Sequence, residues 1–327
     1  MRLEYAQVDW PYKNAFRRAG AVSTSASTIW VKISDGDLVG RGEALGVRYH
    51  GETPASLLSQ LDAVKGAFEG VASLSREELQ SWLPAGGARN AIDCALWDLE
   101  AKGSGRRAWH LAGIEVANPL TTAITLSVDT PDKMAEAARK LGRYSVLKLK
   151  LEGDGDLERV QAVRRARPDA NLIVDANQSW SERQLGEFVA PFDALDVALI
   201  EQPLPVGMDD VLVDYDGPIP LCADESCQTA ESLPELVGKY RVINIKLDKA
   251  GGLTEALRMA ALARELKLDL MVGCMGGASL AMAPGFVFGQ LCFFVDLDGP
   301  LLAAQDVAHP IQYEGSLMYP PDAKLWG

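Results

Sequence analysis

Short runs of apolar and β-branched residues, each closing on polar residues, recur along the chain from residue 122. Successive runs begin 23, 26, 26, 23, 22, 26 and 23 residues apart, which is the length of one strand, one helix and two short loops. This spacing is typical of alternating parallel strands and helices. The runs are TAITLSV from Thr122, SVLKLK from Ser145, NLIVDAN from Asn171, VALIEQP from Val197, PLCADES from Pro220, VINIKLD from Val242, LDLMVGCM from Leu268 and LCFFVDLD from Leu291.

The segments between these runs carry the periodicity of helices, and several begin with Ser, Thr or Asp, which cap helix N-termini. An open doubly wound sheet is the weaker alternative to a closed barrel, because it rarely keeps so even a repeat. We therefore predict an α/β fold with a (β/α) barrel of the TIM type over residues 116–300. The expected helices are PDKMAEAARKL, DLERVQAVRRA, SERQLGEFVAP, TAESLPELVGKY and TEALRMAALAREL.

The two ends of the chain have other patterns. RLEYAQVDW and TIWVKIS resemble strands, whereas SLLSQLDAVKGAF and NAIDCALWDLEAKG have helical periodicity. Residues 1–115 are therefore expected to form an α+β capping domain before the barrel. Residues 301–327 are punctuated by Pro and Gly and are too few to fold alone, so we expect them to pack back on the capping domain.

One segment, residues 270–295, has no charged residue and is long enough to be tested as a membrane span of about 20 residues. Pro284 and five glycines interrupt it, and Asp269 and Asp296 flank it without a cluster of Lys or Arg. We expect a strand, a helix and a strand in the protein core instead.

The charge and the cysteine content of the chain limit its expected partners and location. The 327 residues include 45 acidic and 32 basic side chains, for a formal net charge of −13, which argues against a nucleic-acid or anionic-membrane partner. The five cysteines contain no CxxC pair, and the N-terminus has no apolar signal segment. Reduced thiols and a cytoplasmic location are the expectation.

Ionisable residues gather where the predicted strands end, which is where the chemistry of such barrels lies. Asp175, Glu201 and Asp224 close three consecutive strands, so their carboxylates should converge and repel one another without a cation. Each acid alone is better explained as a helix cap or an ion-pair partner, but three in register favour Mg²⁺, which prefers oxygen ligands. Asn177 and Glu225 stand beside these ligands and are expected to support them.

Lys150 and Lys246 belong to strands two and six, which face each other across an eight-stranded barrel. One amine would then lie on each side of a bound substrate, and burial or a nearby cation lowers a lysine pKa toward that of a general base. Lys148 shares a face with Lys150 and is expected to supply that cation and to contact substrate. The alternative for Lys148 is a surface position at a strand end.

Asp296 and Asp298 are two residues apart on the last strand, so they share a face. Two acids could simply end a strand. The functional interpretation is a binding site for a cationic group of the substrate.

Together these residues resemble the enolase superfamily and, within it, the muconate-lactonising subgroup, whose relatives use a Lys or His base with Mg²⁺. The resemblance covers nearly the whole chain. Each motif alone is weak, but the ordered set is specific. The motifs are GRGEAL and YHGET between Gly40 and Thr53, NAIDCALWDLEAK, KLK, DAN, EQP, DES, NIKLDKAGGL and GCM.

Within that subgroup, DLDGP looks like the DxD signature of dipeptide epimerases. The resemblance implies that Asp296 and Asp298 hold the α-ammonium group of a dipeptide, and that the three carboxylates bind Mg²⁺. It also implies that Lys150 and Lys246 are the acid/base pair of an isomerase. One lysine would remove the proton α to the C-terminal carboxylate, giving a metal-stabilised enediolate, and the other would return a proton on the opposite face, which inverts that carbon.

Two features separate this chain from other relatives. None of its three histidines lies on a predicted barrel strand, which counts against mandelate racemase and many sugar-acid dehydratases. Epimerases acting on Ala-Glu carry a mobile loop like ARGSRTE, whose second Arg meets the glutamate side chain, but residues 19–25 here are AGAVSTS. Arg17 and Arg18 either replace those arginines or are solvated. Whether the substrate has an acidic side chain is therefore left open.

The main alternative is an N-acylamino-acid racemase, which shares the metal and the lysines but binds no ammonium group; o-succinylbenzoate synthase is a weaker third. From another class, a non-catalytic binding protein could keep the barrel, but the intact acids and lysines argue against it. Barrels of this family often assemble, so a homo-oligomer is a further possibility.

Overall fold

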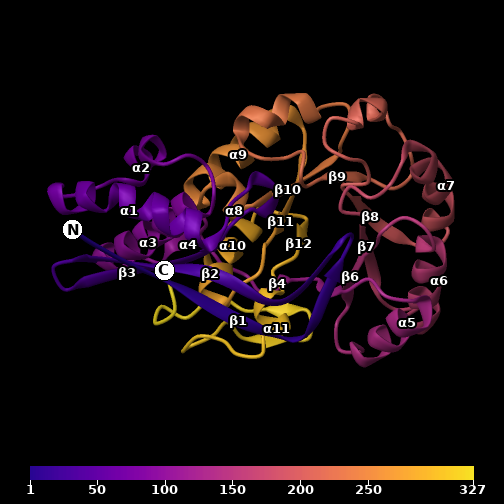
Figure 1. Ribbon diagram of the computed structural model, residues 1–327, viewed down its shortest axis with the longest axis horizontal. Coiled ribbons are helices and arrows are strands. Elements are labelled where there is room, and N and C mark those ends of the chain that lie inside the picture. Colours follow the sequence, from indigo (N-terminus) through magenta and orange to yellow (C-terminus); the bar gives the residue numbers. More distant parts are fainter.

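The computed structural model describes residues 1–327, and in Figure 1 an N-terminal domain of three strands and several helices lies beside a curled sheet ringed by helices. The N-terminal strands form an antiparallel sheet in the order β1-β2-β3. β1 and β2 contain the predicted strands, whereas β3 was not predicted. The elements are β1 (Arg2–Arg18), β2 (Ala21–Asp35), β3 (Leu38–Leu45), η1 (Arg48–His50), α1 (Pro54–Gly70), α2 (Arg76–Trp82), α3 (Gly87–Ser104) and α4 (Ala108–Leu111).

Two glycines of the GRGEAL motif allow α3 to lie directly against β3. A Cβ atom on Gly42 would be 2.1 Å from the carbonyl oxygen of Ala91, and one on Gly40 would be 2.0 Å from that of Ala95. Such distances are far inside van der Waals contact, so any larger residue would separate helix and sheet. The motif therefore sets the thickness of the capping domain.

The second sheet has eight parallel strands that follow one another in chain order, from β5 to β12. Each of the eight predicted runs contains one of them. The sheet curls, and the N–H of Ala123, next to β5, donates to the carbonyl oxygen of Val295 on β12 at 2.8 Å. The strands are β5 (Ile124–Leu126), β6 (Val146–Lys150), β7 (Asn171–Asp175), β8 (Val197–Glu201), β9 (Leu221–Ala223), β10 (Val242–Lys246), β11 (Asp269–Gly273) and β12 (Phe294–Val295).

The helices on this sheet agree with the predicted ones except after β9. There Pro234 stands inside the segment, and the chain forms the 3-10 helix η3, because proline removes a donor that an α-helix needs. The elements are α5 (Pro131–Lys140), α6 (Asp156–Ala166), α7 (Glu182–Asp193), η2 (Asp209–Leu212), η3 (Ala230–Leu236), α8 (Leu247–Ala250), α9 (Leu253–Leu266), α10 (Ser279–Gly289) and α11 (Gly299–Leu302).

The uncharged segment forms β11, α10 and β12, as predicted, and nearly all of α10 is buried. None of the helices combines the length and the apolar character that crossing a membrane requires. The cytoplasmic location stays a prediction.

Apolar side chains pack on both faces of the curled sheet. The largest buried cluster lies largely between its outer face and the helices. A smaller cluster, here called the apolar floor, fills the inside of the sheet. The apolar floor consists of Ile173, Leu199, Cys222, Val242 and Met271.

Two connections tie the N-terminal domain to the rest of the chain. The hairpin of β1 and β2 reaches over the curled sheet in Figure 1, and the Arg17 N–H donates to Ser127 Oγ at 3.0 Å. At the other end, Trp326 Nε1 donates to the carbonyl oxygen of Cys94 on α3 at 2.9 Å. Residues 301–327 also hold β13 (Tyr313–Glu314) and β14 (Leu317–Met318), which form a small sheet with β4 (Leu120–Thr121).

Candidate active site

The inside of the curled sheet changes from apolar to ionisable along the direction of its strands. Side chains two residues apart on a strand point the same way, so four of the five residues of the apolar floor are followed by a polar residue one level higher, and Met271 is followed by Gly273. The ionisable groups therefore lie directly above the apolar floor. The successive residues are Ile173 and Asp175 on β7, Leu199 and Glu201 on β8, Cys222 and Asp224 at β9, and Val242, Asn244 and Lys246 on β10.

The carboxylates of Asp175, Glu201 and Asp224 meet at this level, with oxygen atoms within 4.8 Å of one another. All three side chains are buried. One oxygen of each accepts a hydrogen bond from a protein donor, and the other oxygen lies beside a lysine ammonium group. The donors are the Asn177 N–H to Asp175 Oδ1 at 2.9 Å, Asn244 Nδ2 to Glu201 Oε1 at 2.9 Å, and Lys249 Nζ to Asp224 Oδ1 at 2.7 Å.

This donor set fits Mg²⁺. It consists of three anionic oxygen ligands with no sulfur or nitrogen ligand, which is the chemistry that a hard cation prefers. Glu201 Oε2 makes no hydrogen bond although it is buried. A buried anionic oxygen without a hydrogen bond is costly unless a cation lies beside it, and Lys148 Nζ lies 2.7 Å from this one.

Lys148 occupies the middle of the cluster instead of the protein surface. Its Nζ lies 3.1 Å from Asp175 Oδ2, 2.7 Å from Glu201 Oε2 and 2.7 Å from Asp296 Oδ2, and its side chain is 1% exposed. The ammonium group therefore links Asp175 and Glu201 to Asp296 at the end of β12.

Lys150 and Lys246 approach the carboxylates from two sides. Lys150 Nζ is 2.5 Å from Asp175 Oδ2, and Lys246 Nζ is 2.6 Å from Asp224 Oδ2. Their strands, β6 and β10, are separated by β7, β8 and β9 in the sheet. The two amines are thus held on different parts of the curled sheet, with the carboxylates between them.

Charge within the cluster shifts several pKa values. Burial raises the pKa of Glu201 to about 7, with the charge of Asp175 adding to the effect. Burial acts in the same direction on Asp175, but Lys150 and Lys148 outweigh it and hold the pKa of Asp175 below its usual range.

The expected fall of a lysine pKa is wrong for Lys246. Burial does lower the pKa of Lys246, but the carboxylates of Asp224 and Glu201 outweigh burial and hold the pKa well above its usual range. Ion pairing with a carboxylate is stronger here than the repulsion from Lys148.

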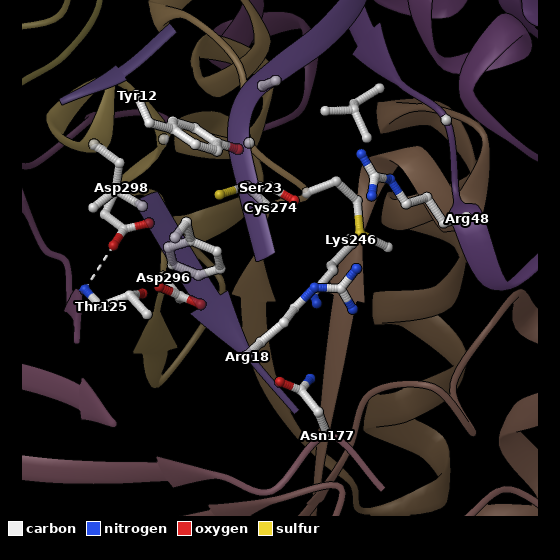
Figure 2. A pocket seen from close by; sticks show the side chains of 18 of the residues that line it. Tyr12, Arg18, Ser23, Arg48, Thr125, Asn177, Lys246, Cys274, Asp296 and Asp298 are labelled. Carbon is white, nitrogen blue, oxygen red and sulfur yellow. Dashed lines mark hydrogen bonds between the residues drawn. The ribbon is translucent and has the colours of Figure 1, made fainter. Parts of the chain in front are cut away.

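Asp296 and Asp298 follow β12 and line the same cavity, where Figure 2 shows both carboxylates beside Thr125. The Thr125 N–H donates to Asp298 Oδ2 at 2.7 Å. Burial raises the pKa of Asp298 to about 7, and the charge of Asp296 contributes. Asp296 Oδ1 is buried without a hydrogen-bond partner.

The cavity has a volume of about 220 Å³ and lies between the curled sheet and the N-terminal domain. Arg18 and Arg48 line it from the N-terminal domain, and in the view of Figure 2 they lie on the side away from Asp296 and Asp298. Neither arginine has a carboxylate within ion-pair distance, although Arg17 lies 3.8 Å from Asp129 outside the cavity. The cavity therefore has an acidic end and a basic end.

Asn177 and Glu225 lie together at the edge of the carboxylate cluster. Asn177 Nδ2 donates to Glu225 Oε1 at 3.4 Å, and both residues line the cavity. Burial and the charge of Asp224 raise the pKa of Glu225 to about 7. Asn177 has a φ of 42°, a left-handed conformation that asparagine tolerates better than most residues.

Sequence reasoning missed Lys249, Asn244 and Arg48. Lys249 follows a strand within the DKAGGL motif, and its position gave no sign that it reaches back to Asp224. Asn244 lies two residues before Lys246, so the alternation of the strand could have identified it. Arg48 lies in another domain, and only the folded chain brings it to the cavity.

Comparison with known protein families identifies the family to which the chain belongs. The profile described as "Enolase C-terminal domain-like" matches residues 132–324, and that of the "Mandelate racemase / muconate lactonizing enzyme, N-terminal domain" matches residues 2–113. The chain belongs to the enolase superfamily. The resemblance inferred from the motifs is confirmed.

Enolase-superfamily relatives with known activities match along nearly their whole length. An N-acetyl-D-glutamate racemase from Pseudoalteromonas sp is 43% identical over 301 residues, covering 91% of this chain and 95% of the relative. An L-Ala-D/L-Glu epimerase from Escherichia coli K12 is 42% identical over 306 residues, covering 93% and 95%. The predicted enzyme class, an isomerase, is confirmed.

Solved structures agree with this assignment. An enolase family member from Agrobacterium tumefaciens with homology to dipeptide epimerases, with bound sodium and L-Ala-L-Glu, superimposes with a TM-score of 0.96 at 42% identity over 99% of both chains. A dipeptide epimerase from Enterococcus faecalis V583, complexed with Mg and L-Leu-L-Tyr, has a TM-score of 0.92 at 27% identity, covering 99% of this chain and 98% of that one.

Proposed function

We propose that the protein is a Mg²⁺-dependent dipeptide epimerase with a closed barrel of the TIM type, and that it inverts the α-carbon of the C-terminal residue. The observation that carries the proposal is the pair Lys150 and Lys246, held on strands four positions apart with a carboxylate cluster between them. Two amines on opposite sides of one carbon are what inversion by proton transfer requires.

In this mechanism one lysine, in its neutral form, accepts the α-proton into its Nζ as the C–H bond breaks. The electron pair left on carbon delocalises into the substrate carboxylate. The other lysine, charged at the start, donates a proton from its Nζ to the opposite face, forming the new C–H bond. Mg²⁺ bound by Asp175, Glu201 and Asp224 would supply positive charge where the carboxylate becomes more negative.

The acidic end of the cavity suits the ammonium group of a free dipeptide. Asp296 and Asp298 are held by Lys148 and by the Thr125 N–H respectively, and Asp296 keeps one oxygen without a partner. An ammonium group has three donors and would satisfy that oxygen. We assign both acids and Lys148 to substrate binding on this basis.

The basic end suits an acidic side chain on the C-terminal residue. Arg18 and Arg48 line the cavity without a carboxylate partner, and guanidinium groups bind carboxylates strongly. Two of the most similar relatives are named for glutamate derivatives, which supports the same preference. L-Ala-L-Glu is therefore the first substrate to test.

An N-acylamino-acid racemase is the second candidate, favoured by the relative that is named N-acetyl-D-glutamate racemase. N-acetylglutamate would use the same lysines, carboxylates and arginines but would offer no ammonium group to Asp296 and Asp298.

The test is incubation with L-Ala-L-Glu, L-Ala-L-Leu or N-acetyl-L-glutamate in D₂O with Mg²⁺, followed by NMR for α-deuterium and for the new isomer. We expect exchange and inversion with L-Ala-L-Glu above all. Exchange only with N-acetyl-L-glutamate would replace the proposal by the racemase. No exchange with any member of a wider set of dipeptides and N-acylamino acids would refute both.

A further inference from the structure

Asn244 is a buried amide directly beneath the proposed base Lys246 on β10. Its Nδ2 donates to Glu201 Oε1 at 2.9 Å, and its side chain is 0% exposed. A carboxylate oxygen can only accept a hydrogen bond, so the nitrogen of the amide must face Glu201. The orientation of Asn244 is therefore fixed by the acid that it holds.

This orientation has an energetic cost. Asn244 Oδ1 is buried and makes no hydrogen bond. A buried carbonyl group without a donor destabilises the folded chain relative to a satisfied one. An apolar residue would fill the position without that cost, so the amide is retained for what its nitrogen does.

Gly273 on β11 forms the wall that keeps the amide in place. It pairs in register with Lys246 on the adjacent strand. A Cβ atom on Gly273 would lie 2.7 Å from Asn244 Oδ1 and 2.8 Å from Asn244 Nδ2. The same Cβ atom would lie 3.0 Å from Lys246 Cε. The backbone of Gly273 is not left-handed, so its lack of a side chain leaves space for Asn244 and for Lys246.

The three carboxylates are supported in different ways. Lys249 contributes a full positive charge to Asp224 at 2.7 Å, which competes with a metal ion for that carboxylate. Asn244 is neutral, so it orients Glu201 through Oε1 without adding a charge there, whereas Glu201 Oε2 lies 2.7 Å from Lys148 Nζ.

We propose that Asn244 is the positioning residue for Glu201 and that Gly273 locks the Asn244 amide in place. The proposal rests on the Mg²⁺ site of the proposed function, but not on the identity of the substrate. Donors behind a metal ligand typically contribute about 10–100-fold to metal affinity.

The experiment measures Mg²⁺ affinity by isothermal titration calorimetry on the full chain without substrate. We expect Asn244→Leu, which has a similar volume and no donor, to bind Mg²⁺ about 10–100-fold more weakly. Gly273→Ala keeps the donor but displaces it, so it should also weaken binding, and it serves as the second variant if Asn244→Leu does not fold.

Val242→Ala is the matched control, because Val242 is two residues away on the same strand and belongs to the apolar floor. It should lower the midpoint of urea unfolding while Mg²⁺ affinity stays within about twofold, since it opens a cavity without touching a ligand donor. A purely structural role of Asn244 would give the same result as Val242→Ala.

Mg²⁺ affinity of either Asn244→Leu or Gly273→Ala within about twofold of the unchanged protein would overturn the proposal. Absence of Mg²⁺ binding in the unchanged protein would overturn it together with the metal site. Mg²⁺ binding by the unchanged protein without any epimerisation would refute the proposed function alone, and the affinities of the variants would still decide the role of Asn244.

Discussion

Lys148 connects two binding regions through one ammonium group. It contacts Asp175 and Glu201 on one side and Asp296 on the other, and all four side chains are buried. A cation shared by three acids lowers the repulsion among them, which allows the proposed metal site and the proposed ammonium site to lie side by side.

Removal of either proposed base should abolish inversion of the α-carbon but leave exchange of the α-proton with solvent for one isomer. We expect Lys150→Met and Lys246→Met each to lose epimerisation by at least about 10³-fold, because each retains an acid/base group on one face only. Each variant should still exchange the α-proton of one isomer in D₂O, and the two variants should exchange opposite isomers. NMR of both L,L and L,D dipeptides measures this, and normal inversion by either variant contradicts the two-base assignment.

The pKa of Asp298 predicts a pH dependence of substrate binding. Burial, aided by the charge of Asp296, raises that pKa to about 7, so Asp298 gains its negative charge as the pH rises through this value. An ammonium group binds the charged form better, so the KM for L-Ala-L-Glu should fall between pH 6 and pH 8.

Asp298→Asn is the control for this dependence, since it removes the charge at every pH. It should raise KM and flatten its pH profile with little change in the urea midpoint. An unchanged KM would exclude the ammonium role, and a profile that stays as steep would assign the dependence to another group.

Arg18 should determine the preference for an acidic side chain. Arg18→Met is expected to lower kcat/KM for L-Ala-L-Glu by about 10-fold or more, since hydrogen bonds to charged groups contribute about 1.5–3 kcal/mol. The value for L-Ala-L-Leu should change by less than about twofold. Arg17→Met is the matched control, because Arg17 points to Asp129 and not into the cavity. Equal losses on both dipeptides would refute a role in specificity.

Among the elements, the packing of α3 on β3 tolerates the least change. Gly42→Ala would place a methyl group 2.1 Å from the Ala91 carbonyl oxygen, so we expect the free energy of unfolding to fall by about 1–3 kcal/mol or more. Gly66→Ala in the exposed part of α1 meets no atom within 4 Å and should stabilise by about 0.5–1 kcal/mol. Urea unfolding of both variants tests this, and similar effects on stability would contradict it.

The parts of the fold that the sequence predicts are those in which local pattern and tertiary structure agree. The eight strands alternate with helices at a regular spacing, and a period of two places Asp175 and Lys246 on the inside of the sheet. β3 was missed because the glycines that let α3 approach also weaken its strand pattern. η3 has the amphipathic pattern of an α-helix but is a 3-10 helix, because Pro234 lies inside it.

The sequence predicts those residues of the candidate site that belong to the repeated strand-and-helix units of the curled sheet. The carboxylates and the two proposed bases follow strands, so their position in the repeat indicates where they lie. Arg18 and Arg48 come from a different domain, and no local pattern specifies which side of a hairpin meets the cavity. Such contacts depend on how the domains pack.

At the scale of the whole molecule, metal binding should increase stability, because the three carboxylates converge only in the folded chain. A Mg²⁺ concentration about 100 times Kd should raise the free energy of unfolding by about 2.7 kcal/mol, and excess EDTA should reverse it. Asp175→Asn should reduce the effect by removing one ligand. Urea unfolding that is independent of Mg²⁺ in the unchanged protein would contradict a metal site.

The hairpin of β1 and β2 brings Arg18 over a sheet that carries all of the proposed proton-transfer groups. Selection can therefore act on the first fifty residues, altering which side chain is accepted, while the groups that move protons stay untouched. A lineage built in this way can drift between related amino-acid derivatives through a few substitutions in one segment, and relatives of similar identity can diverge in substrate without diverging in chemistry.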